Sequence, residues 1–283
     1  MHSLYYEILK EMRNGMNVLG INTGIGPSVC LLRDGKVIFA MEEERLNREK
    51  NTMGFPTLLL QHLEQNYADF LSSLDKVAVA NYNFSFRTLN QFRQKYSVKL
   101  YGRGIVGGLK DRAWLVKQYL KRLVKKDIAE TCKAQEEIID MIVDACPSIA
   151  VGKSDYEFVN HHDCHAGAAY FGLAKCLDRE YLVLTLDGGG DRECATVQVG
   201  NQAALCRIAA TPSGNSIGNI YSITTFMMGM TPHEHEYKVM GLAAYVPQKY
   251  RDSAAEIFRP FLALDNQNQL MFRHGKAGNT NSI

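Results

Sequence analysis

Residues 181–209 have the sequence YLVLTLDGGGDRECATVQVGNQAALCRIA, in which three short apolar segments alternate with two turn-forming segments. Short apolar runs bounded by glycine-rich turns are typical of antiparallel β-strands joined as a meander. The first run, Leu182–Leu186, is predicted to be a buried strand that ends at Asp187, and Gly188–Gly190 are predicted to form the next turn. The stretch therefore predicts three strands and places a carboxylate at the end of the first one.

A similar pattern opens the chain, and the two stretches match in spacing. Asn22 to Gly35 spans 13 positions, as does Asp187 to Gly200, and the two patterns lie 165 residues apart. An accidental match between two hairpin-rich stretches is the alternative, but the matched spacing favours an internal duplication. Two α/β halves that each open with a three-stranded meander predict the actin-like ATPase fold, with a nucleotide or phosphate between the halves. The strands predicted in the earlier pattern are Asn17–Ile21, Ser28–Leu32 and Lys36–Met41.

The duplication predicts three parts of the chain. Residues 1–15 are an N-terminal extension, residues 16–180 are the first half with a helical insertion at about 82–154, and residues 181–283 are a second, incomplete half. A basic segment at 110–126 allows nucleic acid as one interpretation. A solvated basic helix that faces a partner is favoured, because no known nucleic-acid-binding module accompanies the charges. The predicted helices are Leu4–Arg13, Pro56–Leu74, Lys110–Lys126, Ala129–Cys146, Ile217–Met230 and Gln248–Ala263.

One more helix is predicted in the segment VNHHDCHAGAAYFG at 159–172, in which His161 and His165 are four residues apart. This spacing places both imidazoles on one face of a helix. A strand end that delivers Asp187 beside two histidines favours a divalent metal site, and the glycines at 188–190 would let a phosphate approach the backbone. A chance histidine pair and an ordinary Asp-Gly turn remain the alternatives. Of His162, Asp163 and Cys164, one is expected to support the ligands, and the others are expected to be solvated or packed.

A further polar run, HEHEYK, occupies 233–238. Metal binding through His233 and His235 is one interpretation. Lys238, which lies at the start of a helix interrupted by glycine, suits a phosphate contact instead.

Composition excludes several classes of protein. The 283 residues carry a formal charge of +2, with 46% hydrophobic and 22% charged residues, which is ordinary for a globular protein. The seven cysteines include no C-x-x-C pair, which indicates reduced thiols and a cytoplasmic location. The N-terminus is mixed and charged rather than a secretory leader. No apolar run approaches the roughly 18 residues of a membrane span, so no membrane association is expected.

Six segments carry a family resemblance. They are LGINTGIGPSVCLLRDGKVIFAMEEERLNREK at 19–50, GFP at 54–56, VNHHDCHAGAAY at 159–170, LTLDGGGDRE at 184–193, SIGNIYSITTFMMGM at 216–230 and HEHEYKVMGLAAY at 233–245. In this order they resemble the N-terminal half of the nodulation-type O-carbamoyltransferase family. The resemblance covers Val18–Tyr245, and the span 81–154 is poorly matched.

The resemblance implies a function and a site. It implies that a C-terminal YrdC-like module makes carbamoyl-adenylate from carbamoyl phosphate and ATP. It also implies that the N-terminal, metal-binding module, to which this chain corresponds, passes the carbamoyl group to a hydroxyl of a sugar or natural product. It implies an iron-type metal held by His161, His165 and Asp187. No nucleic acid is expected. The nucleotide or carbamoyl phosphate would lie along Asn22, Thr23, Gly24, Gly188, Gly189, Gly190 and Lys238.

Two departures from the family pattern bear on activity. The family's opening turn usually carries a histidine where this chain has Ile25, which cannot transfer a proton, so the catalytic base is unknown. The sequence also stops at Ile283, before a further aspartate ligand and before any YrdC-like module, so the isolated chain is expected to form no adenylate. An expressed fragment, a split-enzyme subunit and a degenerate copy are open alternatives. A non-catalytic nucleotide- or metal-binding scaffold is the alternative function, and a small-sugar kinase is a weaker third.

Overall fold

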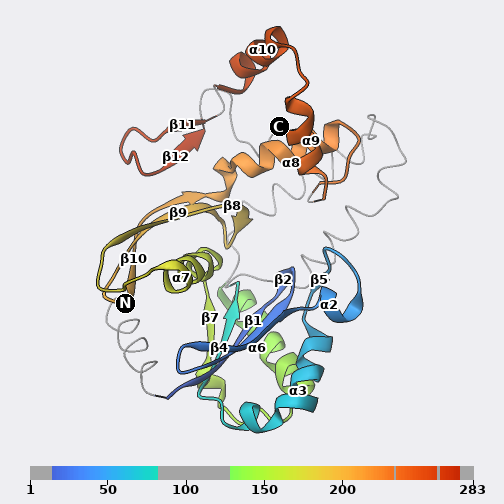
Figure 1. Ribbon diagram of the computed structural model, residues 1–283, viewed down its shortest axis with the longest axis vertical. Coiled ribbons are helices and arrows are strands. Elements are labelled where there is room, and N and C mark those ends of the chain that lie inside the picture. Colours follow the sequence, from blue (N-terminus) through green and yellow to red (C-terminus); the bar gives the residue numbers. More distant parts are fainter. Residues whose placement is uncertain (1–14, 82–127, 233, 260–261, 275–283) are drawn as a thin grey trace. The chain divides into compact units, whose positions relative to one another are not determined.

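The computed structural model describes residues 15–81, 128–232, 234–259 and 262–274, and it has a mixed α/β architecture (Figure 1). The chain forms two compact units, Met1–Val159 and Asn160–Ile283. Several predictions lie outside the described residues. They concern the extension up to residue 14, the basic segment 110–126, His233 and the tail from 275.

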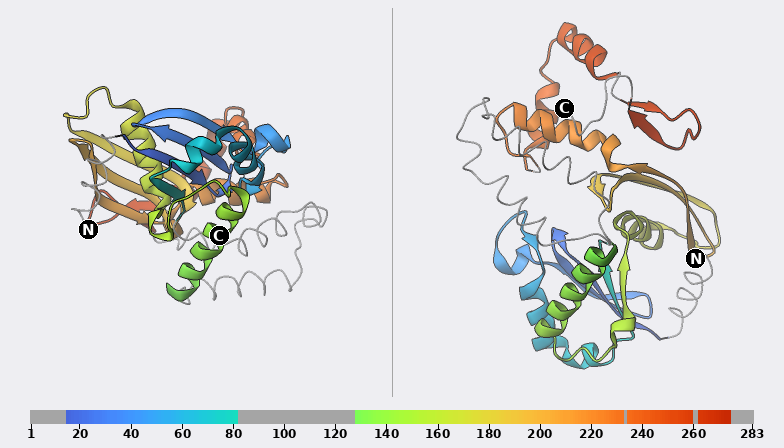
Figure 2. Two further views of the ribbon diagram at one scale, coloured as in Figure 1. Left: turned by 90° about the horizontal axis from the view of Figure 1, so that it is seen from below. Right: turned by 180° about the vertical axis from the view of Figure 1, so that it is seen from behind.

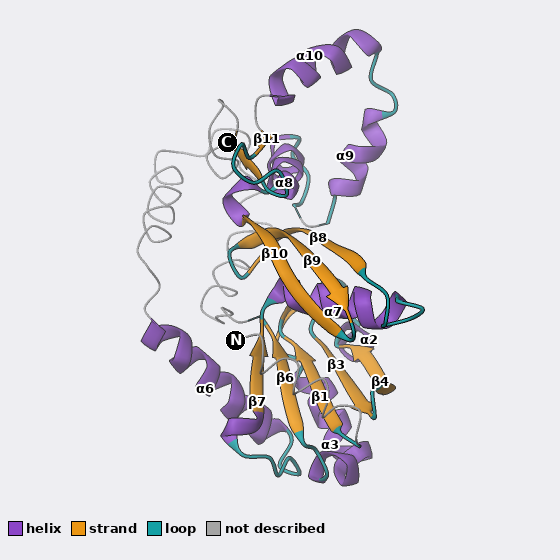
Figure 3. Ribbon diagram, turned by 90° about the vertical axis from the view of Figure 1, so that its left-hand side faces the viewer, coloured by secondary structure: helices purple, strands orange, loops and turns teal. Residues whose placement is uncertain are grey.

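The first unit contains a five-stranded sheet in the order β4-β3-β1-β6-β7 (Figure 3). Strand β1 pairs antiparallel with β3 on one edge and parallel with β6 on the other. Strand β7 continues the sheet in parallel beyond β6. The bounds are β1 Asn17–Asn22, β3 Ser28–Arg33, β4 Lys36–Glu42, β6 Lys76–Ala80 and β7 Tyr156–Val159, with β2 Gly24–Ile25 pairing with β5 Met53–Gly54.

Helices α3 and α6 cover one face of this sheet, and the views of Figure 2 show them side by side. Alternate strand residues such as Leu19 and Leu31 point at that face and are fully buried with Leu59, Leu60 and Leu63 of α3. The buried Glu43 carboxylate accepts hydrogen bonds from the first backbone N–H groups of α3, which fixes where that helix begins. The helices are α2 Glu44–Asn47, α3 Thr57–Ser72 and α6 Ile128–Ala145, followed by the 3-10 turn η1 Lys153–Asp155.

The second unit contains a three-stranded antiparallel sheet in the order β10-β9-β8, with α7 packed on one face. The strand and helix predictions are confirmed here, but the turn prediction was wrong. Gly188–Gly190 belong to β8, and the reversal occurs at Asp191 and Arg192, whose φ angles are 48° and 72°. The bounds are α7 His161–Leu173, β8 Tyr181–Gly190, β9 Glu193–Asn201 and β10 Ala204–Pro212.

The predicted burial of Leu182–Leu186 was also wrong. Val183 and Thr185 are buried on the side of α7, whereas Leu182, Leu184 and Leu186 are 64%, 58% and 72% exposed on the other face. The strand alternates because α7 covers only one face of the sheet. The core of this unit is correspondingly small and centres on Ala166, Tyr170 and Val183.

The remaining elements of the second unit follow β10. The predicted helix from Gln248 ends at Phe258 instead of Ala263, and β11 begins at Leu262. The predicted boundary at 181 placed the histidine helix in the first half, whereas α7 groups with the second unit because it packs on β8 and β9. No helix among the described residues is long and apolar enough to cross a membrane. The elements are η2 Ser213–Asn215, α8 Ile217–Met227, α9 Glu236–Ala243, α10 Gln248–Phe258, β11 Leu262–Leu264 and β12 Phe272–His274.

Candidate metal centre

Helix α7 begins at the residue that caps it, and this start fixes where its histidines lie. The Asn160 side chain accepts hydrogen bonds from the backbone N–H groups of His162 at 2.9 Å and Asp163 at 3.3 Å. Asparagine is a preferred residue at this position because it satisfies donors that have no partner within the helix. His161 then stands at the first helical position, with His165 one turn later.

A break in the pairing of β8 with β9 presents the carboxylate. Leu186 pairs with Ala195 and Gly190 with Glu193, so Asp187, Gly188 and Gly189 oppose a single residue of β9. Bulges of this kind change the direction of a side chain and recur beside active sites. Because the backbone pairing is interrupted at these residues, the Asp187 side chain points to the histidines of α7.

The three predicted ligands meet. Asp187 Oδ2 lies 2.6 Å from His161 Nε2 and 3.5 Å from His165 Nε2, and the two Nε2 atoms are 3.0 Å apart. One ligand atom from each residue fits within a span of 4.8 Å. Donor atoms about 2 Å from a shared ion are themselves roughly 3 Å apart, so the spacing fits a metal-binding set.

Electrostatics keep the carboxylate of this cluster charged. Hydrogen bonds from His161 and His165 hold the pKa of Asp187 far below its usual range, so its carboxylate is ionised. The Asp187 carboxylate in turn raises the pKa of His165 through a hydrogen bond. Two imidazoles and one carboxylate with open positions form the donor set of mononuclear non-haem iron sites. The residues present therefore fit a divalent metal.

His161 is fixed on two sides. Its backbone N–H donates to Asp191 Oδ2 at 2.7 Å. Its ring lies so close to Gly190 that a Cβ there would come within 2.2 Å of the imidazole carbons. Glycine at 190 is therefore required by the histidine itself, independently of any ligand.

The chain matches the family model described as "Carbamoyltransferase N-terminus" over residues 17–277. The chain belongs to this family. It is 30% identical to nodulation protein NolNO of Sinorhizobium fredii over 244 residues, covering 84% of this chain and 30% of that protein. It is also 30% identical to the uncharacterised protein sll1178 of Synechocystis over 241 residues, covering 83% of this chain and 36% of that protein. The chain thus spans about a third of the length of these relatives.

A shorter match and a solved structure complete the comparison for this carbamoyltransferase N-terminus. Nodulation protein NolO of Bradyrhizobium diazoefficiens is 36% identical over 101 residues, which is 35% of this chain and 18% of that protein. A structure from Porphyromonas gingivalis, provisionally described as an N-acetylglucosamine kinase, aligns with a TM-score of 0.30 and 11% identity, covering 86% of this chain and 66% of that chain. A TM-score of this size supports no fold assignment.

Of the other predicted site residues of the carbamoyltransferase N-terminus, Gly188–Gly190 follow Asp187 in β8. The remaining ones are divided between the two units. Asn22, Thr23 and Gly24 are in the first unit, where the Asn22 amide donates to the carbonyls of Ile25 and Gly26 in its own turn. The Ile25 side chain is 58% exposed. Lys238 lies in α9 of the second unit, with its Nζ 5.8 Å from the centroid of the Tyr237 ring.

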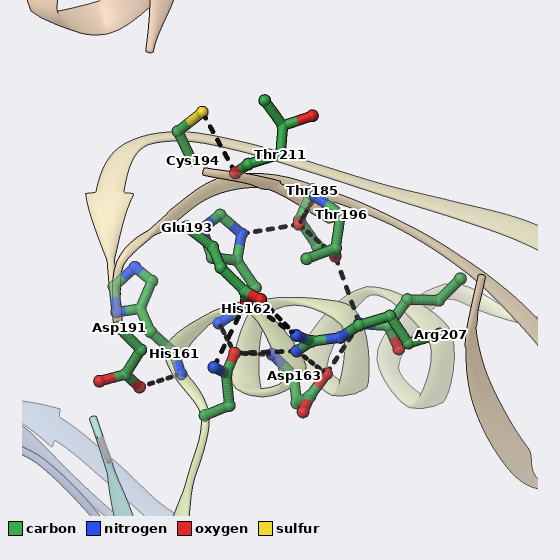
Figure 4. Close-up of polar contacts among 12 residues, drawn as sticks. His161, His162, Asp163, Thr185, Asp191, Glu193, Cys194, Thr196, Arg207 and Thr211 are labelled. Atoms are coloured by element: carbon green, nitrogen blue, oxygen red, sulfur yellow. Dashed lines mark hydrogen bonds and ion pairs between the residues drawn. The ribbon is translucent and has the colours of Figure 1, made fainter. Parts of the chain in front are cut away.

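Most of the residues that support the ligands are not predicted by the sequence. Arg207 on β10 binds Glu193 through one guanidinium nitrogen, and Asn160 and Asp163 through the other (Figure 4). Of the three neighbours considered, Asp163 is the one that joins this network. Asn160 carried a readable signal, since an asparagine directly before a helix is a cap. An arginine within a strand gives no comparable signal, because its partners are set by the fold.

His162 takes part in a separate set of buried hydrogen bonds between α7 and the sheet. Its Nδ1 lies 2.8 Å from Thr185 Oγ1, which also lies 2.7 Å from Thr196 Oγ1. Burial lowers the pKa of this fully enclosed histidine, so it is neutral at physiological pH. His162 therefore joins α7 to the sheet and does not join the ligand set.

Proposed function

We propose that the chain is the acceptor-side module of an O-carbamoyltransferase, which transfers a carbamoyl group from carbamoyl-adenylate to a hydroxyl of a sugar or natural product. The observation that carries the proposal is the convergence of His161, His165 and Asp187 within the stretch that matches the carbamoyltransferase N-terminus. The match to the carbamoyltransferase family model over residues 17–277 supports this class of function, and the similar NolNO and NolO are named as nodulation proteins.

In this proposal His161, His165 and Asp187 hold a divalent metal of the iron type. Such a metal supplies Lewis-acid polarisation of a carbamoyl oxygen or holds an adenylate phosphate. The protein contributes orientation. Asp191 and Gly190 set the position of His161, and the bulge in β8 sets that of Asp187. His165 is the most exposed of the three, with 54% of its side chain accessible.

We further propose the actin-like ATPase fold and a nucleotide site. The strand order β4-β3-β1 of the first unit is repeated by β10-β9-β8 in the second, which supports a duplicated architecture. ATP or carbamoyl-adenylate would lie against the backbone at Gly24 and Gly188–Gly190, with Lys238 as a phosphate contact. Asn22 and Thr23 would shape the first of these turns. The activated donor would come from a YrdC-like module or partner.

A specific observation favours a second candidate, a non-catalytic scaffold of the same fold. Ile25 is exposed in the opening turn and has no group that accepts a proton. General-base catalysis contributes about 10²–10⁴-fold in rate, so a protein without a base elsewhere would bind ligands and transfer little. Both candidates share the metal site and differ in turnover.

Metal analysis tests the shared part of the proposal. The purified chain is loaded with Fe²⁺ under anaerobic conditions, dialysed and analysed for bound iron, alongside His161→Ala. We expect the variant to lose the metal, because three protein ligands leave no spare donor. His62→Ala, which removes a histidine of the first unit, is the matched control and should retain it. Full retention by His161→Ala would refute the assignment.

Transfer assays separate the two candidates. The chain alone, given carbamoyl phosphate, ATP and a hydroxyl acceptor, should show negligible transfer. With an added YrdC-like partner, turnover supports the enzyme and its absence supports the scaffold. Ile25→His should raise residual transfer if that position receives the hydroxyl proton. Robust transfer by the unmodified chain alone would contradict the assignment of roles.

A further inference from the structure

The candidate ligands lie on two separate elements, a helix and a strand, and a network around one arginine side chain connects the two. His161 and His165 lie on α7, whereas Asp187 lies in the bulge of β8. A set of ligands separated in this way holds its geometry only if the start of the helix is fixed against the bulge. Arg207, from β10, contacts the start of α7 and Glu193, the β9 residue that pairs with the first residue after the bulge (Figure 4).

On the helix side, Arg207 Nη2 donates to Asn160 Oδ1 at 2.9 Å and to Asp163 Oδ1 at 2.6 Å. Asn160 is the cap of α7 and Asp163 lies in its first turn, so both belong to the turn that presents His161. The Arg207 side chain is 27% exposed, which makes these contacts less screened than those of a fully solvated pair.

On the strand side, Arg207 Nη1 donates to both carboxylate oxygens of Glu193 at 2.8 Å. Glu193 pairs with Gly190, the first residue after the bulge that contains Asp187. Asn160 Nδ2 also donates to Glu193 Oε2 at 3.4 Å, which closes the connection between helix and strand. The guanidinium therefore bridges the cap of α7 to Glu193, the β9 residue that pairs with the first residue after the bulge.

We infer that Arg207 is a positioning residue, which sets the distance between the histidines of α7 and Asp187 without touching a ligand atom. This inference rests on the metal site proposed above. A planar guanidinium can satisfy three separate acceptors from one place, whereas the single ammonium of lysine cannot match that geometry. Removing residues that orient metal ligands typically costs about 10–100-fold in metal affinity.

The test measures Mn²⁺ affinity and amide hydrogen exchange on the full chain with Arg207→Met, Arg207→Lys and Arg273→Met. We expect R207M to weaken Mn²⁺ binding by about 10–100-fold, and R207K by less. R273M removes a different arginine of the same unit, which pairs with Asp265 at 3.6 Å, and should leave affinity unchanged. R207M should also accelerate exchange of the His162 and Asp163 amides relative to amides late in α7. Lysine covers the case in which R207M fails to fold, because it keeps the charge.

The outcomes separate this inference from the proposed function. If His161→Ala binds Mn²⁺ as the unmodified chain does, the metal site is wrong, and hydrogen exchange alone then decides the role of Arg207. If His161→Ala loses Mn²⁺ while R207M and R207K retain full affinity, the site stands and the inference is overturned. Unchanged exchange at His162 and Asp163 in both arginine variants overturns it as well. Weaker binding with an unchanged melting temperature supports positioning over general stability.

Discussion

Asn22 and Asp187 hold the same position in two similar meanders, yet their surroundings differ. The Asn22 amide donates to Ile25 O at 3.3 Å and to Gly26 O at 2.8 Å, so it closes its own turn. The Asp187 side chain, as a carboxylate, cannot donate, and it takes its hydrogen bonds from Gly188 and two histidines. One repeated pattern thus gives a closed turn in the first unit and an open ligand set in the second.

The two sheets also differ in how many neighbours their corresponding strands have and in how far their faces are buried. In the first unit β1 has a neighbour on each edge, and one of its faces is buried under α3 and α6. In the second, β8 pairs only with β9 among the described residues, and its leucines face outward. The local sequence thus sets the strand and its alternation, but burial depends on which elements cover each face.

Truncating a leucine should affect stability most in the core of the first unit and little on the outer face of β8. Leu63→Ala removes a fully buried side chain of α3 and should lower the free energy of unfolding by about 2–5 kcal/mol, because a cavity forms. Leu184→Ala makes the same chemical change on the exposed face of β8 and should stay within about 0.5 kcal/mol. Urea denaturation followed by circular dichroism measures both. Equal losses would show that the outer face of β8 is covered in solution.

The second prediction compares how the two units begin their principal helices. Glu43→Ala leaves the N–H groups of Leu58 and Leu59 without their acceptor and should cost about 1–3 kcal/mol. Asn160→Ala removes the cap of α7 and should cost about 0.5–2 kcal/mol. Thermal denaturation ranks the two.

Metal affinity then distinguishes these variants. Only Asn160→Ala should weaken Mn²⁺ binding, because only that cap orients candidate ligands. Glu43→Gln, which keeps one acceptor oxygen, is the conservative control for the first unit. Equal loss of metal in Glu43→Ala and Asn160→Ala would contradict a site confined to the second unit.

The smallest expected effect is a dependence of stability on pH, which arises at Asp187 and its histidine partner and has no counterpart at Asn22. The pKa of His165 is raised above 6.5 by Asp187. The stabilisation of the folded state by His165 is therefore complete below 6.5 and is lost as pH rises through the folded pKa. The pKa of Asp187 is depressed below 3.8. The stabilisation of the folded state by Asp187 is therefore present above that value and is lost as pH falls through the folded pKa.

NMR titration of the metal-free chain measures the first of these shifts. We expect a His165 midpoint above 6.5 in the unmodified protein and a lower one in Asp187→Asn. Asn22→Asp is the matched control, because it changes the corresponding position of the first unit and should leave the His165 midpoint where it was. An unchanged midpoint in Asp187→Asn would show that the hydrogen bond to Asp187 does not form in solution.

The sequence predicted the strands and helices well where periodicity and turn residues coincide. Strands β1, β3 and β4, helices α3 and α6, and the convergence of His161, His165 and Asp187 all follow from such local signals. The turn at Gly188–Gly190 was wrong because a bulge extends β8, and glycine suits either conformation. Arg207 and Glu193 escaped prediction because their contact joins two strands and a helix. The actin-like fold, the nucleotide contacts and the metal itself stay predictions.

The edge of β8 that has no paired strand among the described residues has a practical consequence for purifying this stretch of chain. Backbone groups along a strand edge without a partner can hydrogen-bond to another copy, and the part of the chain that the structure describes places no strand on this edge of β8. The outward Leu182, Leu184 and Leu186 add apolar surface beside it. The apparent molar mass measured by light scattering should therefore rise with protein concentration. A lysine introduced at 184 would work against such stacking, as edge lysines do in natural sheets. The same strand that presents Asp187 thus also sets how concentrated a sample can be kept.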